Sequence, residues 1–144
     1  MAKESKYQKL LEDAAWYADP VFDYKINVKE EDPNEVLLAR GNISIENPYD
    51  KSKFNYNFAI GVDGNILFSK GARTKGGYLV DMDLRKSIHD EIINFNESLA
   101  IGIGARRIVV NNEMSEKVRG LYLSRGYNIN DINNQSQRLE KKLK

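Results

Sequence analysis

The residues with the clearest chemical potential lie in VDMDLRKSIHDEIINF, residues 80–95, where a strand-like pattern runs into a helical one. The junction carries Arg85, Lys86, Ser87 and His89, and each of these side chains can donate a hydrogen bond to a phosphate oxygen. The N-terminus of a helix adds free backbone N–H groups and a partial positive charge. The junction contains no glycine, and Ser87 is also a good helix N-cap. A phosphate site here would therefore rest on Arg85, Lys86 and the helix end.

The composition narrows the chemistry open to the chain. Its 144 residues include no cysteine and a single histidine, His89. Thiolate nucleophiles, disulfides and Cys-type zinc sites are excluded, and we expect no metal because a His-rich site is impossible. With 41% hydrophobic and 30% charged residues, the chain can bury a core. The formal net charge of +1 argues against binding to nucleic acid, which usually takes a basic surface.

The sequence also bears on where the protein works. No run of about 18 apolar residues is present, so we expect no transmembrane helix and no membrane partner. The first ten residues, MAKESKYQKL, are too polar for a secretory signal. We therefore expect a cytoplasmic (intracellular) protein. The Asn- and Lys-rich composition would suit a phage or low-GC bacterial protein, which leaves open an oligomer, a larger assembly or association with a virion.

The elements before the junction are read from apolar spacing. Helical spacing predicts a helix over residues 4–18, which Asp19-Pro20 ends because the residue before proline avoids the helical region. Alternation of apolar and polar residues then predicts strands over residues 24–28, 35–45 and 54–62. Asp63-Gly64 is a strong hairpin signal and predicts a return strand in NILFSKGAR. The next predicted strand is YLVDMDL, residues 78–84.

Beyond the junction the apolar period becomes helical. Ile88, Ile92, Phe95 and Leu99 share one face of a helix that Ser87 is expected to cap. A buried strand, RRIVVN, a second helix ended by Gly126 and one more strand in the tail should follow. In the predicted order, consecutive strands come first and strand–helix–strand crossovers follow. This order predicts an α+β fold in one domain, residues 1–144, with a mixed, mostly antiparallel sheet flanked by helices and an added N-terminal helix. The strand after the first crossover should lie parallel to YLVDMDL.

The stretch from residue 56 to 127 resembles the GCN5-related N-acetyltransferase (GNAT) superfamily in the order and spacing of its motifs. The hairpin FAIGVDGNILFSKGAR is similar to the second and third strands of that family. YLVDMDLRKSI resembles its fourth strand, with Val80 and Arg85 matching in spacing and Met82 in place of a proline. GLYLSRGY is the best local match, through Leu121, Tyr122, Gly126 and Tyr127. Residues 1–53 are divergent, and residues 54–144 form the GNAT-like core.

The resemblance implies acetyl-coenzyme A as the acyl donor and an amine as the acceptor. In the family the fourth and fifth strands splay apart around the pantetheine arm, and a loop before the next helix holds the pyrophosphate. Carried over to this sequence, that assigns cofactor binding to Leu79, Val80, Arg85, Lys86, Ser87, Ile88 and His89. A tyrosine of the last helix often protonates the leaving thiolate, and Tyr122 stands at that position. Asp81, or Asp83 beside it, would serve as the base for the amine.

Two hypotheses remain open because the sequence departs from the family. Ile88 aligns with the residue between the two loop glycines, so Ser87 and His89 replace those glycines. The pair of helices usual between the first and second strands is also missing. The chain is therefore either an N-acetyltransferase in which the amine attacks the thioester directly, or a non-catalytic GNAT-fold protein that has lost coenzyme A. In the second case it serves as a binding or structural subunit of a phage or bacterial assembly.

Overall fold

The structure is a computed structural model that describes residues 6–31, 37–48, 51, 53–70, 82–111, 116–133 and 136–143. For residues 30–31, 70, 82–89, 111, 116–118, 130–133 and 136–137 only the backbone is described. The elements in chain order are α1 (Lys6–Ala18), β1 (Asp23–Glu31), β2 (Leu37–Glu46), β3 (Lys53–Gly61), β4 (Asn65–Lys70), α2 (Met82–Gly102), β5 (Arg107–Asn111), α3 (Glu116–Ser124), β6 (Asn128–Asn133) and β7 (Ser136–Lys142).

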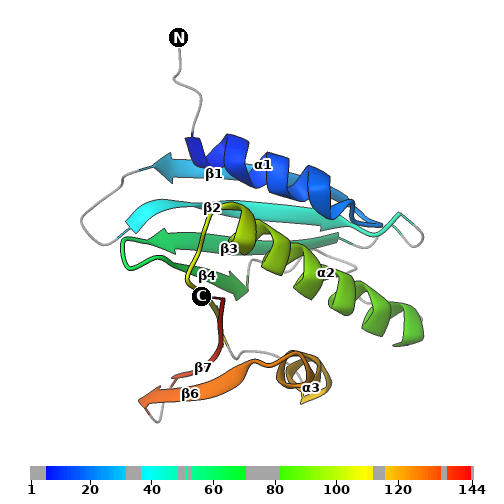
Figure 1. Cartoon of the computed structure of the whole chain (residues 1–144). Coiled ribbons are helices and arrows are strands. Elements are labelled where there is room, and N and C mark those ends of the chain that lie inside the picture. Colours follow the sequence, from blue (N-terminus) through cyan, green and yellow to red (C-terminus); the bar gives the residue numbers. More distant parts are fainter. Residues whose placement is uncertain are drawn as a thin grey trace.

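The strands form one seven-stranded sheet in the order β1-β2-β3-β4-β5-β7-β6. Every neighbouring pair is antiparallel except β4 and β5, which are parallel and joined through α2. The helices α1 and α2 lie on the same face of the sheet (Figure 1). The architecture is therefore the mixed, mostly antiparallel α+β sheet with an added N-terminal helix that the sequence predicts.

The hydrophobic core lies between this helix-bearing face and the two helices. Along β3, Phe58 and Ile60 are buried while Asn57, on the opposite face, is exposed, as period-two alternation requires. Each fully buried aliphatic side chain contributes roughly 1.5–3 kcal/mol to folding. The largest fully buried apolar side chains are Phe95, Leu11, Ile43, Ile45, Ile66, Ile93, Leu99, Ile108 and Leu139.

The predicted hairpin is present between β3 and β4. Gly64 has φ of 88° and its N–H donates to the carbonyl of Gly61 at 3.1 Å, which closes the turn. Asp63 Oδ1 accepts a hydrogen bond from the Asn65 N–H at 3.0 Å. The Gly64 carbonyl in turn accepts from the N–H of Arg106 at 2.8 Å. The hairpin thus also fixes the point at which the chain enters β5.

The prediction for the junction after this hairpin was wrong in two respects. The helix α2 begins at Met82, so residues 82–84 are helical and Ser87 lies in the second turn rather than at the N-cap. The strand that precedes the crossover is Asn65–Lys70, and β5 lies parallel to it rather than to YLVDMDL. Residues 78–81 lie outside the described part of the chain. The hairpin therefore supplies the third and fourth strands of the sheet, where the resemblance assigned the second and third.

The tail of the chain differs from the prediction, whereas the connection between β1 and β2 agrees with it. The tail forms two strands, β6 and β7, where one was predicted. The connection from β1 to β2 consists of residues 32–36 alone, which is too short for a pair of helices. This agrees with the departure from the family noted in the sequence.

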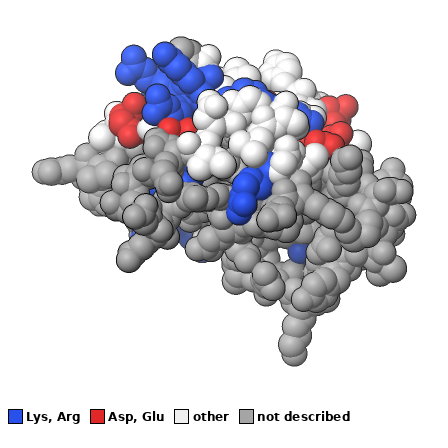
Figure 2. All heavy atoms as spheres, turned by 90° about the horizontal axis from the view of Figure 1, so that it is seen from below, with Lys and Arg blue, Asp and Glu red and all other residues white. Residues whose placement is uncertain are grey.

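The surface around α3, β6 and β7 carries charges of both signs. Figure 2 looks onto this end of the molecule, where the visible Lys and Arg side chains lie among Asp and Glu side chains and uncharged residues. Arg107 pairs with Glu140 at 3.5 Å, and Lys141 with Glu97 at 3.2 Å. No helix in the described ranges is both long and apolar enough to cross a membrane.

Candidate functional site

The sheet divides between β4 and β5, and this fork is the centre of the candidate site. Parallel pairing joins β4 to β5 over four positions, from Asn65 opposite Arg107 to Phe68 opposite Val110. Beyond Phe68, Ser69 and Lys70 remain paired with β3, while Asn111 pairs with β7. The backbone groups that β4 would direct toward β5 therefore have no strand partner there among the described residues. Such groups are free to bind an extended ligand.

Tyr56 stands at the open end of the fork, directly opposite Lys70 in the β3–β4 register. Its hydroxyl donates a hydrogen bond to Oδ1 of Asn96 on α2 at 2.6 Å. Tyr56 is half-buried as a residue, and burial of its hydroxyl, together with the nearby Tyr122, raises the pKa of Tyr56 well above 10. The Tyr56 hydroxyl therefore stays protonated, and its hydrogen bond to Asn96 links β3 to α2 beside the fork.

Tyr122 and Tyr127 form the wall of the site on the side of α3. Their rings meet edge to face, with centroids 5.0 Å apart and planes at 83°. Tyr122 is 7% exposed and Tyr127 3% exposed. Burial, with the negative charge of Glu97 as the second cause, raises the pKa of Tyr122 to about 12. At neutral pH the Tyr122 hydroxyl is therefore protonated and can donate a hydrogen bond.

Glu97 on α2 and Lys141 on β7 complete the cluster. Lys141 Nζ lies 3.2 Å from Glu97 Oε1 and 5.6 Å from the centre of the Tyr127 ring. Burial, and after it the charge of Glu97, raise the pKa of Tyr127. Glu97 is near enough to act through its charge, but the Tyr127 hydroxyl makes no hydrogen bond of normal geometry to any described residue. We name Tyr56, Asn96, Glu97, Tyr122, Tyr127 and Lys141 the tyrosine cluster.

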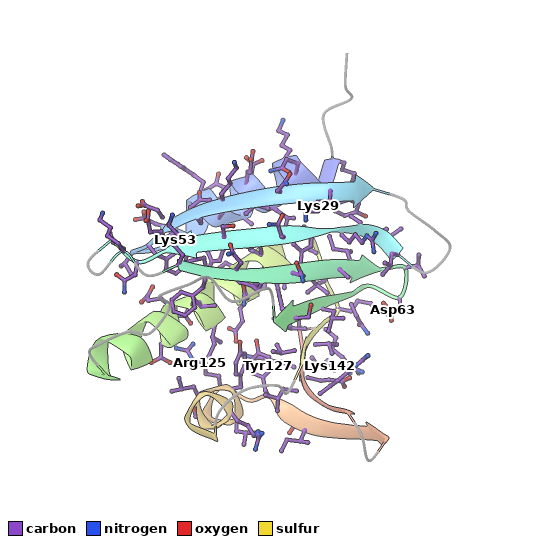
Figure 3. All side chains as sticks on the ribbon, turned by 180° about the vertical axis from the view of Figure 1, so that it is seen from behind. Lys29, Lys53, Asp63, Arg125, Tyr127 and Lys142 are labelled. Atoms are coloured by element: carbon purple, nitrogen blue, oxygen red, sulfur yellow. The ribbon has the colours of Figure 1, made fainter. Side chains whose placement is uncertain are left out.

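The turn after α3 holds this wall against α2. Gly126 has φ of 92°, a conformation that ends the helix, and the Tyr127 N–H returns to the carbonyl of Tyr122 at 3.2 Å. Arg125 bonds Asp90 Oδ1 at 3.1 Å and also Oδ1 of Asn94, both on α2. Figure 3 shows Arg125 and Tyr127 in the region between α2 and the α3–β6 segment. The position of Tyr122 is therefore set by the turn that follows it, which is tied to α2 through Arg125.

The structure brings together some of the predicted site residues and leaves others undescribed. Tyr122 lies in the tyrosine cluster. Leu79, Val80 and Asp81 lie outside the described residues, and the side chains of Arg85, Lys86, Ser87, Ile88 and His89 do as well. Their backbone is helical, and in an α-helix each N–H bonds the carbonyl one turn earlier. The N–H groups of Ser87, Ile88 and His89 are therefore used inside α2, and the free ones belong to the turn that begins at Met82.

Sequence reasoning missed most of the tyrosine cluster. Tyr56 could have been placed, because it shares the buried face of its strand with Phe54 and Phe58. Asn96 and Glu97 carried no such signal, since their partners are 40 and 44 residues away in sequence. Among the residues that the structure describes, no group of three or more His, Cys, Asp or Glu side chains could hold a metal ion.

Comparison with known proteins gives one informative likeness. No protein-family model matches the sequence. No curated protein matches it either. A crystal structure of an acetyltransferase from Bacillus subtilis in complex with CoA superposes with a TM-score of 0.52 over 85% of this chain and 99% of that chain, at 13% sequence identity. The chain therefore has a GNAT-like α+β fold, as the order of its motifs predicts, at low sequence identity to that enzyme.

Proposed function

We propose that the protein is an acyl-CoA-dependent N-acetyltransferase in which an amine attacks the acetyl thioester directly. The observation that carries the proposal is the fork between β4 and β5, with Tyr122 buried beside it, in the fold of an acetyltransferase whose crystal structure contains CoA. A direct attack needs orientation and hydrogen-bond donors but no covalent intermediate. This suits a chain that has no cysteine and one histidine.

The residues present fit the donor in part. On the side away from β3, the backbone of Ser69 and Lys70 has no strand partner among the described residues and could bond an extended pantetheine chain. Arg85 and Lys86 fall within the first turns of α2, where cations and free N–H groups favour a pyrophosphate. The loop that the family places before this helix corresponds here to residues 71–81, whose sequence contains Gly71, Gly76 and Gly77. If the loop is placed at residues 71–81, it contains glycines. The alignment that placed it at Ser87 and His89 left it with none.

When bound, acetyl-CoA supplies the acetyl group as a thioester, which is open to attack by an amine. Tyr122 is the candidate donor to the thiolate that leaves. A thiol ionises at a pKa near 8.5, so proton transfer from a hydroxyl of pKa about 12 is uphill by roughly 5 kcal/mol. Tyr122 therefore acts best as a hydrogen-bond donor that stabilises the leaving sulfur. Asp81 remains the proposed base for the amine, and Asp83 the alternative.

A second candidate function is a non-catalytic binding or structural subunit. The burial of Tyr122 favours it, because burial raises the pKa of this hydroxyl to about 12 and makes it a weak acid toward a thiolate. The missing helix pair between β1 and β2 also removes a segment that would flank an acceptor. In this case the partner would be another protein of a larger assembly.

Release of free thiol from acetyl-CoA, measured with a panel of primary amines and lysine peptides, separates the two candidates. We expect Tyr122→Phe to lower kcat by more than about tenfold and to leave KM for acetyl-CoA within about twofold. Tyr17→Phe is the matched control, because Tyr17 is 86% exposed on α1. Equal kcat in both variants would remove Tyr122 from the mechanism. Absence of thiol release in the wild type with every amine would favour the binding subunit.

A further inference from the structure

The strand β1 lies at one edge of the seven-stranded sheet, and among the residues that the structure describes it pairs with β2 alone. The N–H and C=O groups of an edge strand can pair with a strand of another molecule. In Figure 1 the helix α1 runs alongside β1 at this edge. The partners of the outward-facing backbone groups of β1 therefore determine whether a strand of another molecule can pair with this edge.

Gln8 of α1 occupies the middle of this edge. Its Nε2 donates to the carbonyl of Ile26 at 2.8 Å, and its Oε1 accepts from the N–H of Val28 at 2.9 Å. Gln8 Nε2 also lies 2.8 Å from Oε1 of Glu12, one turn later on the helix. One carboxamide thus bonds the C=O of one residue and the N–H of the residue two positions on. The N–H and C=O of one residue in a parallel neighbouring strand, or of two residues in an antiparallel one, would make the same pair of bonds.

The two bonds also reveal which residues face the free edge. The N–H and C=O of one strand residue point to the same side, and alternate residues share that side. Tyr24, Ile26 and Val28 therefore direct their backbone groups away from β2. A second copy of β1 in antiparallel orientation, centred on Ile26, would place Tyr24 opposite Val28 and Ile26 opposite its own counterpart. Six backbone hydrogen bonds would form, two for each of these three pairs.

The side chains of that register are complementary in charge. Lys25 would face Asn27, and Asp23 would lie close to Lys29 of the second copy at both ends, where a bulge between Val28 and Glu30 ends the regular ladder. In each chain Gln8 already bonds the Ile26 C=O and the Val28 N–H. Four of the six backbone hydrogen bonds between the two copies would need one of these groups. A symmetric strand pair is therefore encoded in β1 and blocked in the folded chain.

We propose that Gln8 seals the β1 edge, and that the surface beneath it fits the β1 strand of a second copy of this chain. The helix α1 is anchored independently of Gln8, through the fully buried side chains of Leu11 and Ala15. Loss of the carboxamide therefore opens the edge and leaves the helix attached. The inference concerns the edge of the sheet and does not depend on the proposed acetyl transfer.

The test compares Gln8→Ala with Lys9→Ala, since Lys9 is the exposed neighbour on the same helix and alanine favours helix at both positions. Sedimentation should give Gln8→Ala a mass that rises with concentration to twice that of the wild type, while Lys9→Ala keeps the wild-type mass. At low concentration the Val28 amide of Gln8→Ala should exchange with solvent more than about tenfold faster than in the wild type.

Adding Asp23→Lys to Gln8→Ala tests the register, because it places lysine close to Lys29 and should reverse the association. If Gln8→Ala does not fold, Gln8→Met, which is similar in length and a good helix former, takes its place. A folded variant at Gln8 that keeps the wild-type mass up to about 1 mM would overturn the proposal, and so would equal association of Lys9→Ala.

Discussion

At the scale of single residues, the site is built from hydroxyl donors that cannot ionise near neutral pH. Tyr56, Tyr122 and Tyr127 are held in a cluster where burial is the main cause of their raised pKa values. A buried phenol resists ionisation because the phenolate would lose its hydration. Residues of this kind orient and polarise a ligand and are poorly suited to accept its protons. The base of the proposed reaction must therefore lie elsewhere, as the assignment of Asp81 requires.

The three buried tyrosines predict a loss of stability at high pH. An unfolded tyrosine ionises near pH 10, whereas folded Tyr122 needs a pH of about 12 and the pKa values of Tyr56 and Tyr127 are raised as well. Below pH 10 both states keep their protons, so these groups add no pH dependence. Above it only the unfolded chain loses them, and the free energy of unfolding falls by roughly 1.4 kcal/mol per pH unit for each tyrosine.

Urea unfolding between pH 9 and 11.5 measures this slope, and Tyr122→Phe should reduce it by about one third. Phenolate absorbance provides an independent check. The chain has eight tyrosines, so with three protected no more than five should ionise while it is folded at pH 10.5. Ionisation of all eight in the folded protein would contradict the burial of the cluster.

At the scale of elements, local patterns predicted the strands and the hairpin but misplaced the start of α2. Alternation in YLVDMDL favoured a strand because Tyr78, Val80, Met82 and Leu84 are spaced as on one face of a pleated sheet. The same Leu84 lies four residues before Ile88 and extends the helical stripe, which was the signal for an earlier start. Short apolar runs fit both periods, and only the pairing of β5 with β4 decides between them. The contacts of Tyr56 and Glu97 depend on the same long-range packing.

The substitution Ser87→Ala distinguishes a helix that begins after Ser87, as the sequence predicted, from one that begins at Met82, as in the structure. If Ser87 capped the helix, its loss would cost about 1 kcal/mol of unfolding free energy. In the second turn of α2, where the structure places it, alanine is a slightly better helix former, and we expect a change within about 0.5 kcal/mol. Urea unfolding measures the difference. Gly126→Ala is the positive control and should cost about 1 kcal/mol or more, because Gly126 has φ of 92°. If Ser87→Ala lowers the free energy of unfolding as much as Gly126→Ala does, Ser87 is the N-cap and the helix starts after it.

At the scale of the whole molecule, a GNAT-like sheet is combined with an altered N-terminal half. The chain replaces the helix pair between the first two strands by residues 32–36 and places α1 along the edge of β1 instead. The fork in the sheet is retained, with the tyrosine cluster beside it. In the proposed reaction the fork would hold the donor, and the acceptor side lacks the helix pair between β1 and β2. This favours a large acceptor, such as a lysine on another protein.

Calorimetric titration with acetyl-CoA tests the central claim most directly. We expect saturable heat with one site per chain and a melting temperature that rises with ligand concentration. Arg85→Ala combined with Lys86→Ala should weaken binding by about tenfold or more, because two charged contacts to the pyrophosphate are lost. Lys9→Ala, on the exposed face of α1, should bind as the wild type does. No heat and no thermal shift at about 1 mM acetyl-CoA would contradict the account and leave the fold without its cofactor.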